Sequence, residues 1–138
     1  MTKWAQSLIR ISNYEVETLQ KRLADIATRR ATAQMRLAVL DAERELETEN
    51  ARECPSSARL LEAYLGGWKQ RRDTAQSDLH EVESEETGAR DALMAAFEEL
   101  KKFEHVAETT RLHQLAAVAR RESAAMDEQA IRRASRAG

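Results

Sequence analysis

The chain has 138 residues, enough for one domain, and its composition is that of long helices rather than of a globular enzyme. Charged residues make up 33% of the chain and aromatic residues 4%, while Pro occurs once and Gly four times, so few positions can stop a helix. The formal net charge of −2 speaks against the strongly basic surface that nucleic-acid binding requires.

The first predicted helix covers residues 3 to about 52. Its apolar residues alternate at spacings of three and four, which places them on one stripe, as in a coiled coil. The a positions are Val16, Leu23, Arg30 and Leu37, and the d positions are Leu19, Ile26, Ala33 and Leu40. With local slips of register, the stripe is extended by Leu8, Ile9, Ile11 and Leu46.

The predicted turn lies at about residues 53 to 57, around the single proline, Pro55. Proline disfavours helical geometry in the residue before it and lacks a backbone N–H, so the first helix should end just before this point. Ser56 or Ser57 can then cap the next helix. Cys54 is the only cysteine, so no disulfide can form within the chain.

The second predicted helix covers residues 57 to about 134. Its seam continues over several heptads through Leu61, Leu65, Trp68, Ala75, Leu79, Val82, Ala89, Leu93, Ala96, Leu100 and Phe103. Past residue 107 the register shifts to a thinner stripe of Leu112, Leu115, Ala119, Met126 and Ala130. The pair Gly66-Gly67 is the weak point, where we expect a kink or a late helix start.

These elements predict an all-α fold, in which two long helices form one antiparallel coiled-coil hairpin domain over residues 1–138. Folding at Pro55 pairs residues whose numbers sum to about 111, and this leaves a C-terminal overhang from about residue 108 that carries an exposed apolar stripe, a typical docking site. Three polar residues, Arg30, Arg72 and Glu86, occupy seam positions and can fix the register, with Arg30 expected near Glu81.

The sequence predicts no catalytic, cofactor or metal site. The three histidines, His80, His105 and His113, are not spaced as a chelating helical pair. The carboxylates of residues 78–86 are best read as a solvated face, with an acidic partner-binding patch as the alternative, because a two-helix rod has no pocket in which to separate their pKa values. No apolar run approaches the roughly 20 residues of a membrane span, and the N-terminus does not resemble a signal peptide. We therefore expect a cytoplasmic chain that is monomeric when isolated.

Two stretches resemble a known family. The run Ala96-Phe97-Glu98-Glu99-Leu100-Lys101-Lys102-Phe103-Glu104, followed by Arg121-Glu122 and by Met126-Asp127-Glu128-Gln129-Ala130-Ile131-Arg132-Arg133, is similar to the C-terminal signature of the flagellar export protein FliJ family. Leu61-Glu62-Ala63-Tyr64-Leu65 resembles the start of that family's second helix, and the opening Lys3 to Glu17 is compatible with the family.

The resemblance implies a non-enzymatic, stalk-like component of the flagellar type III export apparatus, cytoplasmic and peripherally associated with that apparatus at the inner membrane. The implied partners are the hexameric export ATPase, which the family binds and activates, the cytoplasmic domain of the export gate membrane protein, and the export chaperones. Carried over by position, the predicted ATPase contacts are Leu100, Phe103, Met126, Asp127, Glu128, Arg132 and Arg133. Two alternatives stay open: the equivalent stalk of a virulence-type injectisome, and a generic structural coiled coil that dimerises along its seam.

Overall fold

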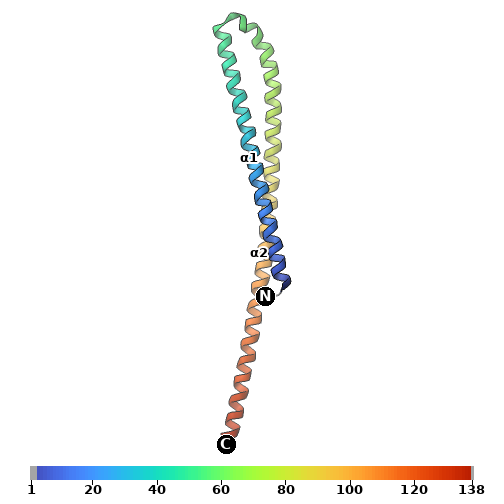
Figure 1. Ribbon diagram of the computed structural model, residues 1–138, viewed down its shortest axis with the longest axis vertical. Coiled ribbons are helices and arrows are strands. Elements are labelled where there is room, and N and C mark those ends of the chain that lie inside the picture. Colours follow the sequence, from blue (N-terminus) through green and yellow to red (C-terminus); the bar gives the residue numbers. More distant parts are fainter. Residues whose placement is uncertain (1–2, 138) are drawn as a thin grey trace. The chain divides into compact units, whose positions relative to one another are not determined.

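The computed structural model describes residues 3–137, which form two long helices (Figure 1). α1 spans Lys3–Glu53 and α2 spans Pro55–Ala137. Residues 3–137 contain no strand, and the two helices pack against each other in opposite directions, so the predicted all-α antiparallel hairpin is confirmed.

The turn between the helices is a single residue, Cys54, where we expected residues 53 to 57. Pro55 is the first residue of α2, a position that suits proline because N–H groups in the first turn of a helix have no intrahelical acceptor. The Cys54 N–H donates to the Asn50 carbonyl at 3.0 Å, and the Cys54 carbonyl accepts from the Ser57 N–H at 3.1 Å. Cys54 thus ends α1 and precedes the first residue of α2. The sequence had predicted Ser56 or Ser57 in the position before α2.

The chain divides into two compact units, and each contains parts of both helices. Unit 1 consists of Met1–Val16 and Ala95–Gly138, and unit 2 is Glu17–Met94. The assignment of residues 1–138 to one domain stays a prediction.

Unit 2 contains the turn and two apolar clusters on the seam. One cluster joins Ile26, Leu23, Val82 and Ala89, and the other joins Leu37, Leu40, Tyr64, Trp68 and Ala75. In the second cluster the indole N–H of Trp68 donates to the Leu40 carbonyl, and the Arg44 guanidinium lies 4.9 Å from the centre of the Trp68 ring. Burial on the predicted a and d positions explains why these residues form two paired helices.

The register of unit 2 lies close to the predicted one, but one predicted contact is wrong. Residue numbers in contact sum to values from 108, for Leu40 and Trp68, to 116, for Arg30 and Glu86. Arg30 therefore pairs with Glu86 and not with the exposed Glu81. Helix side chains tilt toward the N-terminus of their own helix, and in antiparallel helices this brings two long side chains together from backbone positions that are offset.

The seam of unit 1 corrects the prediction for the N-terminal stripe. Its buried residues are Ala5, Ser12, Val16, Ala96, Leu100 and Ala107. Ile11, which we placed on the stripe, is 62% exposed, while the neighbouring Ser12 is buried. Ser12 lies four residues before Val16, so the heptad continues without a slip and spacing outweighs the polarity of the hydroxyl.

At the turn end of α1, in unit 2, the prediction for Leu46 was also wrong. Leu46 is 62% exposed, whereas Glu43 and Thr48 are half-buried and Ala51 is buried. Six residues after Leu40 a helix has turned through about 240° beyond one full turn, so Leu46 faces away from the seam.

α2 continues as a helix through Gly66 and Gly67, so the late helix start that we considered does not occur. Beyond the adjacent residues and the nearby backbone of α2 itself, a Cβ atom placed on either glycine would have no atom within 4 Å. Neither glycine has a positive φ, so neither is needed for a turn.

Candidate partner-binding surface

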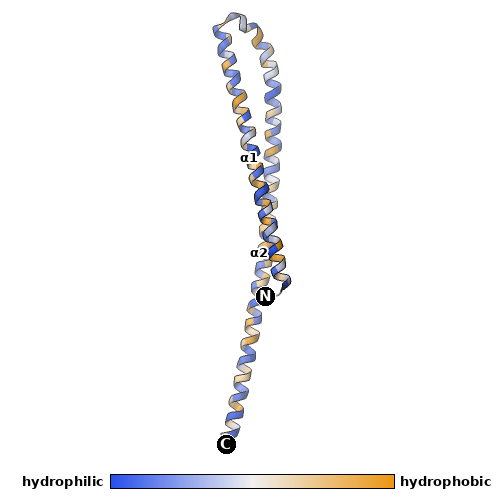
Figure 2. Cartoon of the chain, viewed as in Figure 1, coloured by the Kyte–Doolittle hydropathy of each residue, from blue (hydrophilic) through white to orange (hydrophobic). Residues whose placement is uncertain are grey.

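The C-terminal segment of α2, residues 111–137 of unit 1, is exposed at every position except the half-buried Ala117. Five large apolar side chains lie on it with exposures between 40% and 70%: Leu112, Leu115, Val118, Met126 and Ile131. Figure 2 shows apolar residues alternating with polar residues along this end of α2. Apolar side chains repeated along a helix without a covering element mark a surface suited to a partner.

Local interactions support helix in this segment. Alanine, the best helix former, occurs at residues 116, 117, 119, 124 and 125. Arg132 pairs with Glu128 one turn earlier at 2.9 Å, and Arg111 pairs with Glu108 at 2.6 Å. The hydrogen bonds that Arg111 donates to Glu108 lower the pKa of the carboxyl group and raise the pKa of the guanidinium.

The seven predicted contact residues fall into two groups. Leu100 is buried on the seam and Phe103 is half-buried, so these two support the fold of unit 1. Met126, Asp127, Glu128, Arg132 and Arg133 are all exposed. At 1.5 Å per residue, Met126 lies about 35 Å along α2 from Phe103, too far for one continuous contact with a single side chain or loop.

The exposed group lies on more than one face of α2. Because each residue turns a helix by about 100°, Met126 and Arg133 share a face with Leu112 and Leu115. The Glu128–Arg132 pair lies on a different face. We define the C-terminal face as Leu112, Leu115, Ala119, Met126 and Arg133. The predicted contact set omitted Leu112 and Leu115, although the sequence pattern placed both on one stripe with Met126.

Residues 3–137 were also compared with the requirements of a metal site, a membrane span and a reactive thiol. Among residues 3–137, no group of three or more His, Cys, Asp or Glu residues is arranged to hold a metal ion. Within the same residues, neither helix has a segment apolar enough to cross a membrane. Hydrogen bonds from the Ser56 and Ser57 hydroxyls lower the pKa of the exposed Cys54 thiol to about 7.

Comparisons with known proteins point to one family. The family model described as "Flagellar FliJ protein" matches residues 5–138. Proteins named "Flagellar FliJ protein" from two strains of Caulobacter vibrioides, NA1000 / CB15N and ATCC 19089 / CIP 103742 / CB 15, are each 52% identical to the chain over 138 residues. These alignments cover 100% of the chain and 99% of each relative. No solved structure matches the chain.

The match extends from the first turn of α1 to the end of α2 and includes the stretches on which the resemblance was based. The chain therefore belongs to the FliJ family and is a component of flagellar protein export.

Proposed function

We propose that this chain is a non-enzymatic stalk that binds and activates the hexameric ATPase of the flagellar export apparatus. The observation that carries the proposal is the exposed C-terminal face of α2, which keeps Leu112, Leu115 and Met126 in water over about 20 Å of helix. A monomeric protein of this size gains nothing from such a stripe unless another surface covers it.

The shape of this segment fits a partner with a groove or a central opening. A lone helix presents side chains on all sides, so a ring can contact several faces at once, whereas a flat partner can cover only one. Apolar contacts would come from Leu112, Leu115 and Met126, and charged contacts from Asp127, Glu128, Arg132 and Arg133. The N-terminal part of α1 belongs to the same compact unit, so unit 1 as a whole would approach the ATPase.

The proposal extends to location and to further partners. We place the chain in the cytoplasm, peripherally at the inner membrane, in contact with the export gate and with export chaperones. Nothing in the geometry assigns particular residues to the gate or to the chaperones. We also propose that the isolated chain is a monomer, because its seam is already filled by its own two helices.

The test is stimulation of ATP hydrolysis by the purified export ATPase. We expect the triple variant Met126→Ala/Asp127→Ala/Arg133→Ala to lose most of the stimulation. The matched control, Met35→Ala/Asp25→Ala/Arg22→Ala, changes the same residue types at exposed positions of unit 2 and should keep it. Undiminished stimulation by the C-terminal variant would show that this surface does not bind the ATPase.

A second experiment addresses the identity of the partner. The wild-type chain, used as bait in an extract of the source cells, should recover the hexameric export ATPase. The triple C-terminal variant should recover much less of it. Failure of the wild-type chain to recover the export ATPase would contradict the proposal.

A further inference from the structure

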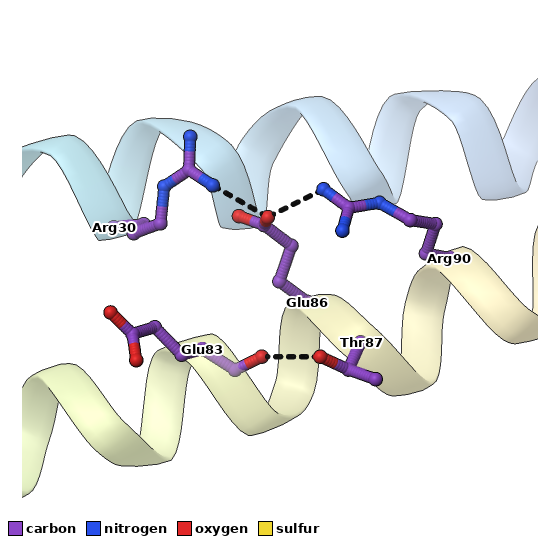
Figure 3. Close-up of polar contacts among 5 residues, drawn as sticks. All are labelled: Arg30, Glu83, Glu86, Thr87 and Arg90. Carbon is purple, nitrogen blue, oxygen red and sulfur yellow. Dashed lines mark hydrogen bonds and ion pairs between the residues drawn. The ribbon is translucent and has the colours of Figure 1, made fainter.

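A charged layer crosses the apolar seam of unit 2 (Figure 3). The Glu86 side chain is only 7% exposed, and its Oε1 atom accepts hydrogen bonds from Arg30 of α1 at 2.6 Å and from Arg90 of α2 at 2.7 Å. Arg30 crosses from the opposite helix, while Arg90 reaches back from the next turn of the same helix. One carboxylate thus joins both helices.

Two buried polar atoms of this charged layer lack a hydrogen-bond partner. Both arginines bind Oε1, and the buried Oε2 atom of Glu86 has no hydrogen-bond partner, nor has the buried Nε of Arg30. A buried ion pair with unsatisfied atoms recovers less than the cost of removing both charges from water. Stability alone does not account for this layer.

The repetitive seam gives the layer a second role. Seam residues alternate at spacings of three and four along both helices, so sliding one helix past the other by a heptad again places seam residues opposite seam residues. Arg30 would then lie opposite Leu79 or Leu93 instead of Glu86. Glu86 would lie opposite Leu23 or Leu37. Either slip buries Arg30 against leucine without a partner and leaves Glu86 paired with Arg90 alone.

Other contacts of unit 2 discriminate less between registers. Arg72 pairs with the exposed Asp41, and a heptad slip would place it opposite Gln34 or Thr48, both polar. Trp68 donates to a backbone carbonyl, and α1 offers a carbonyl at every residue. Beside the turn, the covered positions of α1 are Glu43, Thr48 and Ala51, none of them a large apolar residue. The seam is therefore thin where a slip would move the turn by about one helical turn.

We propose that the layer of Arg30, Glu86 and Arg90 fixes the antiparallel register of unit 2. It excludes the registers displaced by one heptad, at some expense of stability. This inference concerns the folding of the hairpin and does not depend on the proposed partner.

The test is a distance measurement by pulsed electron spin resonance. Spin labels are placed at the exposed positions Lys21→Cys and Gln70→Cys, in the full chain carrying Cys54→Ser. The sites are widely offset along the helices, so a heptad slip changes their separation by up to about 10 Å. We expect one distance for the native layer and a second, displaced distance when Arg30→Leu/Glu86→Leu is added, with no fall in melting temperature.

Two further variants make the result decisive. Arg29→Leu/Glu85→Leu removes an ion pair with the same sequence separation, but one whose side chains are about half exposed, and should retain a single distance. Arg30→Glu/Glu86→Arg/Arg90→Glu rebuilds the layer with reversed charges and should also show one distance. A single unchanged distance in the leucine variant, or several distances in the reversed-charge variant, overturns the proposal.

Discussion

The thiol of Cys54 lies at the turn and contacts the Ser56 hydroxyl at 3.0 Å. Hydrogen bonds from Ser56 and then Ser57 stabilise the thiolate and lower the pKa of Cys54 from 9.0 to about 7. A thiol of this kind reacts with alkylating reagents at a pH where an ordinary cysteine is mostly protonated.

We therefore predict that the rate of alkylation of Cys54 by iodoacetamide reaches half its maximum near pH 7. Removing the largest cause, in Ser56→Ala, should move this midpoint to higher pH, because the thiolate loses a donor. Mass spectrometry of the labelled chain at a series of pH values gives both midpoints. A wild-type midpoint close to 9 would contradict the assigned hydrogen bonds.

Trp68 combines burial, a hydrogen bond and a cation–π contact on one side chain. Trp68→Phe keeps most of the apolar area but removes the donor to Leu40 and weakens the contact with Arg44. We expect it to lower the free energy of unfolding by about 1–2 kcal/mol, as measured in urea. Trp4→Phe, at an exposed position of unit 1, is the matched control and should change little. Equal effects of the two substitutions would show that Trp68 is not an anchor.

Contacts between individual side chains were harder to predict from the sequence than the helices themselves. Arg30 was expected on the seam but beside Glu81, because counting along two rods ignores the direction in which side chains lean. Ser12 was missed because its polarity suggested a surface position, while its spacing from Val16 placed it on the seam. Contacts depend on side-chain geometry, which residue numbers alone do not encode.

At the scale of the element, periodicity predicted both helices because the alternation of three and four residues needs no knowledge of the partner. Near the ends of α1, the predicted stripe departed from this spacing in order to include the apolar residues Ile11 and Leu46. Both are exposed. The buried positions of a coiled coil are therefore predicted better by continuing the heptad spacing than by choosing the nearest apolar residue.

The glycines of α2 give a prediction about the stability of the element. Because Gly66 and Gly67 are helical and open space surrounds the added methyl groups, Gly66→Ala/Gly67→Ala should raise the free energy of unfolding by about 1–2 kcal/mol. The reverse change nearby, Ala63→Gly, should lower it by about 1 kcal/mol. Urea titrations monitored by circular dichroism at 222 nm measure both changes. Destabilisation by the alanine pair would mean that this part of α2 needs glycine.

At the scale of the whole molecule, the family could be inferred from two stretches of α2, residues 96–104 beside the seam and residues 121–133 beyond it. Residues 111–137 contribute almost nothing to a core, so their pattern reflects something other than folding. The faces on which the predicted contacts lie could not be read from the signature alone. Only helical geometry separates Met126 and Arg133 from the Glu128–Arg132 pair.

The central claim is that the C-terminal segment of α2 is uncovered in the free chain and becomes covered by the export ATPase. Hydrogen–deuterium exchange of the full chain, with and without the purified ATPase, tests this most directly. A helix without tertiary packing opens readily, so we predict fast exchange at residues 112–137 in the free chain and slow exchange at residues 23–40. Adding the ATPase should protect residues 112–137. Protection of that segment in the free chain, or unchanged fast exchange with the ATPase bound, would contradict the account.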